Sequence, residues 1–326
     1  MIGFGKQMSR TGRALMAAVA VGALGAGAAM ANPVAPSLKP SPTLSSTWLE
    51  TSDFTLLTRA LDAADDGLWS QVRSYLDRIG DPAAQALIRW RIATNGDTGM
   101  GYSDLIKAME EFKGWPDLSK IEDQLEITII RSSLTSDERI AWLLARGPQT
   151  GEGVLALADA YHSQGKMDDR LRVIREAWRA RAMSTGAAAA IQVQFAGDLS
   201  AEDHFARADM FLWRGDTKSA QALLSKLSAG RRKIIEARIA LMKNAKNVDK
   251  TVNAVPTEYM DDPGLLFDRA RWAERKGRQS DELSYLLRIN GETAPVGGRE
   301  EIWGEKQSVM RRMIRERDYQ KAYQLA

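Results

Sequence analysis

The chain has 326 residues, with 45 Lys and Arg, 42 Asp and Glu, and no Cys. The lack of Cys excludes disulfides, thiolate catalysis and zinc–thiolate sites. Three of the cations, Lys6, Arg10 and Arg13, lie within residues 1–31, which hold no acid, so the rest of the chain has 42 charges of each sign, a balance that disfavours nucleic acid as a partner.

The first 47 residues carry export and linker signals. Residues 1–31 predict a cleaved signal peptide, because cations precede an apolar stretch and Ala-Met-Ala at 29–31 has the form of a cleavage site. The alternative is an uncleaved anchor, which the Ala and Gly content of the stretch disfavours. Residues 32–47 contain four Pro and several Ser and predict a flexible linker. We therefore expect a periplasmic protein without a stable membrane anchor.

Residues 48–326 have helical periodicity and a recurring pair of small residues. The pairs that carry this pattern, an Ala seven positions before a Gly, are Ala60/Gly67, Ala158/Gly165, Ala208/Gly215 and Ala270/Gly277. An aliphatic side chain follows each Gly by nine positions, at Leu76, Ile174, Leu224 and Leu286. Such a Gly ends one helix in the left-handed conformation and the next helix begins at once, which makes an αα-hairpin.

These hairpins predict the fold class. One hairpin cannot bury both of its apolar faces, so each must pack on its neighbours. The sequence therefore predicts an all-α protein, a superhelical array (α-solenoid, similar to tetratricopeptide repeats) of irregular hairpins that is curved or ring-like. The uneven Gly spacing excludes a regular 34-residue repeat. Coincidence of common residue types is the alternative.

In chain order, the expected helices share apolar residues at helical spacing and polar or Pro residues at their starts. They are 54–64, 68–79, 82–93, 102–112, 118–132, 137–146, the hairpin 154–181, 186–196, the hairpin that begins with the capping box at 200–203, 230–243, 249–254, the hairpin 265–289, 300–317 and a last helix from Asp318. The Gly-rich residues 95–101 are expected to be a turn, because no strand precedes them and no Lys-Ser/Thr follows. The Ala-rich 186–196 is expected to be buried, and each unit is expected to bury a Trp.

The last expected hairpin has only begun when the sequence ends. Arg317 and Asp318 stand where the earlier unit has Gly215 and Asp216. We expect that residues 48–326 form a scaffold domain truncated at its C-terminal end, and that the natural chain continues past Ala326. A frayed natural terminus is the alternative.

Single residues do not indicate an active site. The only histidines, His162 and His204, have no partner at metal-ligand spacing. Paired acids at 65–66, 168–169 and 261–262 lie at helix boundaries, which favours capping, and those at 110–111 and 300–301 are expected on exposed faces. The basic runs 231–233 and 311–312 are expected to be solvated, with contact to an anionic glycan or phosphate as the alternative. We therefore expect no catalytic, cofactor-binding or metal-binding residue in this chain.

Four stretches carry a family resemblance. They are Phe-Lys-Gly-Trp-Pro at 112–116, Arg-Arg-Lys-Ile-Ile-Glu-Ala-Arg-Ile-Ala-Leu at 231–241, the stretch from Val-Pro to Asp-Asp-Pro-Gly-Leu-Leu-Phe-Asp-Arg-Ala-Arg-Trp at 255–272, and Trp to Asp-Tyr-Gln-Lys-Ala-Tyr at 303–323. Together they resemble the N-terminal α-superhelical, U-shaped domain of soluble periplasmic lytic murein transglycosylases. Lys113 and Gly114 stand where that family has Asn-Pro, and Gly304 and Lys306 also depart from its pattern.

The resemblance implies part of a murein-cleaving enzyme. In the family, a C-terminal lysozyme-like domain cleaves the MurNAc–GlcNAc bond of peptidoglycan to 1,6-anhydromuramoyl products, with one Glu as general acid and then base. The family's Glu-Ser pair and Gly-Leu-Met-Gln stretch occur nowhere in these 326 residues. The implied chain is the inactive scaffold part, with glycan strands and its own C-terminal catalytic domain as partners. The alternative is a stand-alone periplasmic helical-repeat adaptor that binds a protein or peptide.

Overall fold

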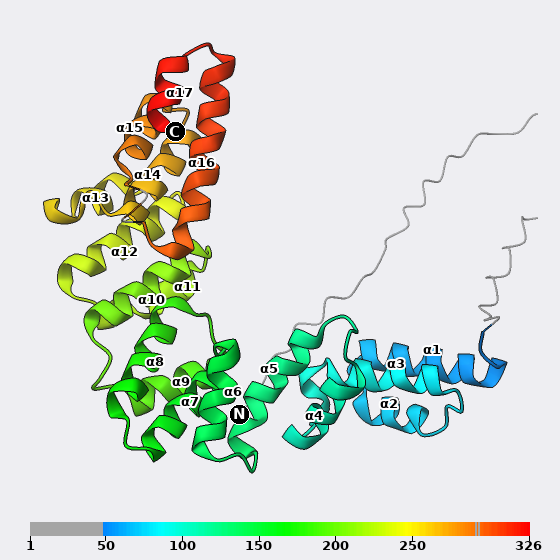
Figure 1. Cartoon of the computed structure of the whole chain (residues 1–326). Helices are drawn as coiled ribbons and strands as arrows, with labels where there is room; N and C mark the ends of the chain where they lie inside the picture. The colour runs from blue at the N-terminus through cyan, green and yellow to red at the C-terminus, as the bar shows by residue number, and fades with distance from the viewer. Residues whose placement is uncertain (1–47, 291, 293) are drawn as a thin grey trace, which may run out of the picture. The chain divides into compact units, whose positions relative to one another are not determined.

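The computed structural model describes residues 48–326 except 291 and 293, so the predicted signal peptide and linker lie outside the described residues. The described part is all-helical, with 17 α-helices, four short 3-10 helices and no strand among these residues (Figure 1). The all-α prediction is confirmed at this level. Within the same part, no helix combines the length and apolar character needed to cross a bilayer.

The helices follow one another with short connections. The first nine are α1 (Thr51–Asp65), α2 (Trp69–Leu76), α3 (Pro82–Ala93), α4 (Tyr102–Glu111), α5 (Leu118–Thr128), α6 (Ser136–Arg146), α7 (Gly151–Ser163), α8 (Met167–Ala180) and α9 (Thr185–Gln194). The other eight are α10 (Ala201–Trp213), α11 (Thr217–Ala222), α12 (Ala229–Met242), α13 (Val248–Asn253), α14 (Pro263–Arg275), α15 (Gln279–Arg288), α16 (Val296–Arg315) and α17 (Tyr319–Leu325). The 3-10 helices are η1 (Gly96–Thr98), η2 (Ile129–Arg131), η3 (Leu224–Lys226) and η4 (Thr257–Tyr259).

The predicted glycine turns are confirmed. The four hairpin glycines have φ between 69° and 77°. At Gly215, the following amide of Asp216 donates to the carbonyl of Phe211 across 2.9 Å, which satisfies an otherwise orphaned carbonyl of the helix end. Arg317 makes the same turn without a glycine, at φ 63°, and the Asp318 amide donates to Met313 at 2.9 Å.

Side-chain caps start several helices where the sequence predicts them. The Asp81 carboxylate accepts from the Ala84 amide at 2.8 Å, with Pro82 in the first turn. Ser200 and Asp203 form a complete capping box at the start of α10. These caps fix the start of each helix and therefore which of its faces is turned to its neighbours.

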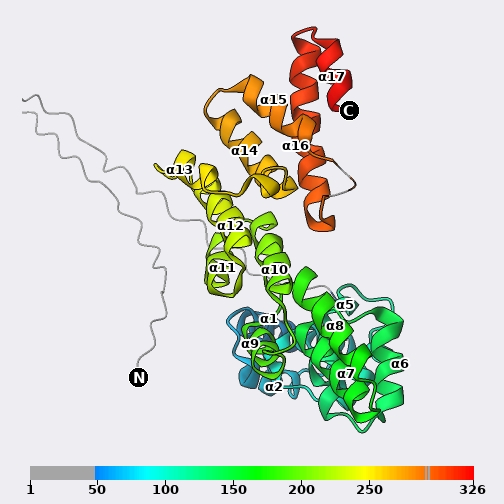
Figure 2. The ribbon, with the colours of Figure 1, turned by 90° about the vertical axis from the view of Figure 1, so that its left-hand side faces the viewer.

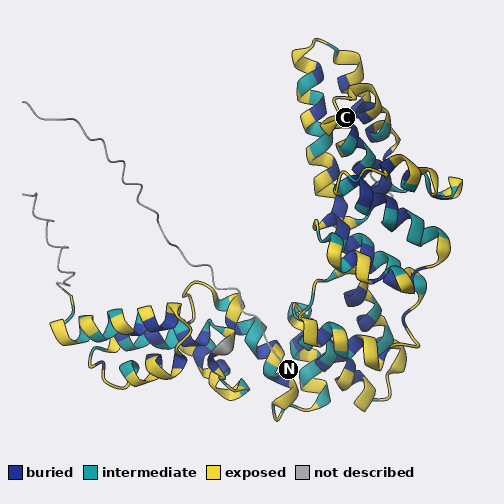
Figure 3. Ribbon diagram, turned by 180° about the vertical axis from the view of Figure 1, so that it is seen from behind, coloured by how far each residue is buried: buried dark blue, intermediate teal, exposed yellow. Residues whose placement is uncertain are grey.

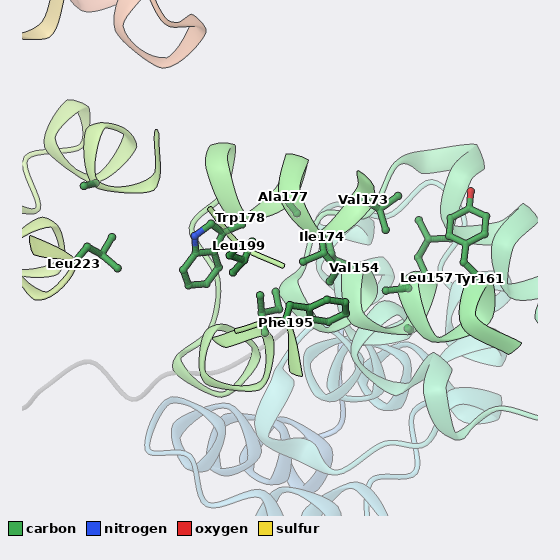
Figure 4. Close-up of a cluster of buried hydrophobic side chains, with 14 of the residues drawn as sticks. Val154, Leu157, Tyr161, Val173, Ile174, Ala177, Trp178, Phe195, Leu199 and Leu223 are labelled. Atoms are coloured by element: carbon green, nitrogen blue, oxygen red, sulfur yellow. The ribbon is translucent and has the colours of Figure 1, made fainter. Parts of the chain in front are cut away.

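The interior is divided among five successive clusters of buried apolar residues. Burial runs as stripes along the helices, with exposed residues on the opposite faces (Figure 3). The cluster around α7 and α8 holds Ile174 and Trp178, both fully buried, with Phe195 against them (Figure 4). Figure 2 shows α7 between α6 and α8, which are its neighbours in the chain and its packing partners.

Two packing expectations are corrected. Helix α9 is not buried, because only Ala187 and Ile191 turn inward and most of its other residues are exposed. Only three of the nine Trp are buried, namely Trp69, Trp178 and Trp213, while Trp48, Trp115 and Trp303 are exposed. The aliphatic residues nine positions after the hairpin glycines do pack inward, since Ile174 and Leu286 are fully buried and Leu76 and Leu224 are partly buried against the core.

Candidate binding groove

Two adjoining hollows flank the C-terminal end of α5, and we call them together the α5 groove. One has a volume of about 440 Å³ and is lined by α5, η2, α7, α8 and the end of α9. The other, of about 500 Å³, lies against the Gly-rich loop before α4. Ile127 and Arg131 line both hollows, so the two form a continuous surface. Each volume is within the range of sites for small ligands.

The groove has an apolar floor because of the period of α5. Ile121, Leu125 and Ile129 face the core and are almost fully buried. Ile127 on α5 and Ile130 on η2 fall outside this spacing and therefore lie on another side, where they are 39% and 44% exposed. Two exposed β-branched apolar side chains in one hollow mark a surface suited to an apolar group of a ligand.

Charged side chains surround this floor. Arg131 on η2 is exposed, and its side chain makes no hydrogen bond or ion pair with any described residue. Asp159 on α7 is 3.5 Å from Arg139, and the carboxylate of Glu152 accepts from the Ser184 hydroxyl at 2.5 Å. The acids in the groove are therefore already engaged, while Arg131 is available to an anionic group.

Arg170 on α8 forms one wall of the groove. Its guanidinium lies over the ring of Phe195, 4.6 Å from the ring centroid, and both residues line the hollow. The Arg170 Nε–H is buried and has no acceptor among the described residues. A buried donor without a partner is unfavourable, so an acceptor oxygen on a ligand or a water molecule would satisfy it.

Two deeply buried acids, Glu126 and Asp203, are held by hydrogen bonds and ion pairs. Glu126 on α5 accepts from the amides of Gln149 and Thr150, the latter at 2.7 Å, and pairs with Arg146. It thereby fastens the start of α7. Asp203 closes its own capping box and pairs with Arg179. The carboxylates are fully engaged and are therefore unsuited to shuttle a proton.

Arg238 on α12 forms the centre of a buried ion network. It donates to Asp209 on α10 and, across 2.6 Å, to Asp268 on α14. Burial lowers the pKa of Arg238, but the two aspartates outweigh burial and hold that pKa above its ordinary value. A hollow of about 300 Å³ adjoins Asp268, but the Asp268 carboxylate is occupied by Arg238.

Among the described residues, neither histidine belongs to a group of side chains that could ligate a metal ion. His162 is exposed on α7. His204 on α10 is buried edge-on against Trp178, with ring centroids 5.7 Å apart, and burial together with Lys226 and Arg207 lowers its pKa. The Arg207 guanidinium lies over the Trp178 ring, 3.8 Å from the ring centroid. Burial lowers the pKa of Arg207 to about 10.

The paired acids and basic runs are mostly engaged locally. Asp262 caps α14, whereas Asp65, Asp169 and Asp261 make exposed ion pairs. The basic run at 231–233 is also occupied. Arg231 lies over Phe205 and Tyr259, Arg232 donates to carbonyls, and Lys233 pairs with Glu236. Arg312 pairs with the buried Glu282, whereas Arg311 is exposed and has no ion pair with any described residue.

Sequence reasoning missed the α5 groove. Residues 95–101 were expected to be only a turn, and they contain η1 and line the second hollow. The sequence does not indicate that Arg131 and Arg170 line one groove. They are single cations 39 positions apart, and their proximity depends on how α5 packs against α7 and α8. The one available signal was that Ile127 on α5 and Ile130 on η2 fall outside the apolar period of Ile121, Leu125 and Ile129.

The family-like stretches lie at packing positions. In 112–116, Phe112 is buried against Trp115, and the Trp90 indole N–H donates to the Pro116 carbonyl at 3.0 Å. The stretches 231–241 and 255–272 meet at Arg238 and Asp268. Comparisons of the chain with protein-family models, curated proteins and solved structures found no match. The resemblance to lytic transglycosylases thus stands on these residues alone.

Proposed function

We propose that this chain is the scaffold part of an exported, periplasmic lytic transglycosylase and that it binds glycan strands of peptidoglycan in the α5 groove. The observation that carries the proposal is Arg170, whose buried Nε–H lacks an acceptor beside the apolar floor of a groove. Bond cleavage to 1,6-anhydromuramoyl products would belong to a lysozyme-like catalytic domain, which these 326 residues do not contain.

The chemistry of the groove supports a glycan strand as ligand. Peptidoglycan presents acetamido methyl groups and ring faces beside many oxygen acceptors, and its stem peptides carry carboxylates. Ile127 and Ile130 suit the apolar parts, and the Arg170 Nε–H suits an oxygen. Arg131 suits a carboxylate, because a guanidinium pairs with it through two parallel hydrogen bonds.

We also propose that the hairpins form a superhelical array. The main helix contacts join elements that are close in sequence, such as α7 with α8, α8 with α10 and α12 with α14. Five successive apolar clusters replace one central core. Both features are typical of stacked repeats. The contact of α10 with α16 departs from a strictly linear stack.

A peptide-binding adaptor is the second candidate. The adjacent exposed Ile127 and Ile130 favour it, because an apolar side chain of a partner peptide would fit the same floor. In that case the ligand would be a protein segment, and peptidoglycan would not compete for the groove.

The test is co-sedimentation of the full chain with purified peptidoglycan sacculi. The wild type is expected in the pellet, and Arg131→Glu is expected to remain largely in the supernatant. Arg214→Glu is the control, because Arg214 is an exposed arginine outside the groove and the substitution changes the charge equally. Absence of wild-type binding, or equal loss in both variants, would reject the glycan proposal, and a partner peptide would then be sought.

A further inference from the structure

Three glutamates from three helices converge at the C-terminal end of α14. Glu274 on α14, Glu282 on α15 and Glu305 on α16 each offer a carboxylate oxygen, and these oxygens lie within 4.8 Å of one another. Glu274 is exposed, Glu305 is partly buried and Glu282 is almost completely buried. The cluster is therefore accessible from one side and closed on the other.

Glu282 is the unusual member of the group. Its side chain is 1% exposed, and its Oε2 accepts from Arg312 at 2.5 Å. Its Oε1 is buried and has no hydrogen-bond partner among the described residues. A buried carboxylate oxygen without a partner is costly, and a second ligand of positive charge would satisfy it.

The local charges leave an excess of negative charge. Arg312 pairs with Glu282, and Arg271 approaches Glu305 only to 3.9 Å. Burial and the neighbouring Glu274 raise the pKa of Glu305, since three close carboxylates repel one another. Two arginines therefore face three carboxylates, which leaves one negative charge in the cluster without a partner.

We propose that Glu274, Glu282 and Glu305 bind a divalent cation of the calcium class, a site that lies apart from the α5 groove and does not depend on the proposed function. Calcium takes oxygen ligands at about 2.3–2.6 Å, so ligands on its opposite sides are at most about 5 Å apart. Oxygens within 4.8 Å fit this span. Magnesium usually keeps several waters and is bound through one or two carboxylates in octahedral geometry, so a set of three carboxylates suits it less well.

The bound ion would hold three helices together. One ligand comes from each of α14, α15 and α16, and the carboxylates would no longer repel one another. The ion binds the folded chain and has no preformed site in the unfolded chain, so it raises stability by mass action. The bound cation would therefore stabilise the packing of α14, α15 and α16 against one another.

The test is thermal unfolding of the full chain after chelation, with and without added Ca²⁺ or Mg²⁺. We expect Ca²⁺ at about 100 times its Kd to raise Tm by about 5 °C, and Mg²⁺ at the same concentration to raise it less. Isothermal titration with Ca²⁺ alone is expected to give one site per chain. No Ca²⁺-dependent shift would overturn the proposal, and so would a stoichiometry above one.

Two matched variants localise the effect. Glu274→Gln removes an exposed ligand, so the chain is expected to fold as the wild type does and to lose the Ca²⁺ shift. Glu300→Gln removes an equally charged, exposed side chain from α16 outside the cluster and is expected to keep the shift. Retention of the shift in Glu274→Gln, or its loss in Glu300→Gln, would contradict the assignment.

Discussion

Arg238 on α12 donates its Nε–H to Oδ2 of Asp268 on α14 across 2.6 Å, and neither side chain is more than 7% exposed. The same guanidinium donates to Asp209 on α10, so one arginine joins three successive helical hairpins. Arg238 and Asp268 belong to the two central family-like stretches. These two residues thus serve packing between hairpins.

Asp268→Ala is expected to destabilise the protein by about 3–5 kcal/mol, because it leaves the buried Arg238 with an incomplete set of counter-charges. Urea unfolding at neutral pH measures the change. Asp65→Ala is the control, since Asp65 pairs with Arg91 at the surface and should cost less than about 1 kcal/mol. Similar losses in both variants would contradict a special role for the buried network.

Arg317→Gly is expected to stabilise the protein by about 1 kcal/mol. Arg317 has φ 63°, a conformation that a residue with a Cβ adopts at a cost and glycine adopts freely. The reverse change, Gly215→Ala, places a Cβ at φ 77° and should destabilise by a similar amount. Chemical unfolding of both variants checks the pair, and a destabilised Arg317→Gly would be inconsistent with the turn.

Gly153→Ala is expected to destabilise by about 1–3 kcal/mol, since overpacking forces neighbours to move. An added Cβ would lie 2.5 Å from Oε2 of Glu126, which itself fastens the start of α7. Gly304→Ala on α16 is the matched control, because nothing lies within 4 Å of its added Cβ. Helix propensity alone predicts that this control gains up to about 1 kcal/mol. Equal effects in the two variants would refute the close approach of Glu126 to the backbone at Gly153.

The buried His204 is expected to make stability depend on pH. Burial holds the pKa of His204 below its ordinary value of 6.5, so as pH falls through 6.5 the unfolded chain takes up a proton before the folded one. The free energy of unfolding is therefore full above this pH and decreases below it. In His204→Phe, which keeps an aromatic ring against Trp178, this decrease should be smaller.

Urea unfolding at about pH 7.5 and about pH 5 measures this difference. His162→Phe is the control, because His162 is exposed on α7 and is the only other histidine. It should retain the wild-type decrease in stability. A full decrease in His204→Phe would show that other groups cause it.

The sequence predicted the features that depend on neighbours in the chain. Three such features are the turn at Gly215, the cap at Asp81 and the capping box at Ser200. Each involves residues only a few positions apart, so it can be predicted from the local sequence. The expectation that α9 is buried failed for the opposite reason. Its Ala content is compatible with burial, but exposure is decided by which helices pack on it.

The α5 groove and the glutamate cluster were not predictable for that same reason. Arg131 and Arg170 come from different helices, as do Glu274, Glu282 and Glu305. No spacing rule joins such residues, because their distances follow from helix packing rather than from sequence separation. Glu282 in particular stands where the first hairpin has the buried Val72, five positions after the glycine.

The most direct test of glycan binding is the Kd of the full chain for soluble peptidoglycan strands, measured by isothermal titration. Ile130→Asp should weaken binding by about tenfold or more, because it places a charge on the apolar floor of the groove. Leu144→Asp is the matched control, since Leu144 is an exposed apolar residue on α6 outside the groove. Binding by the wild type and Leu144→Asp, with loss in Ile130→Asp, is the predicted result. No binding by the wild type, or equal Kd values for the two variants, would contradict it.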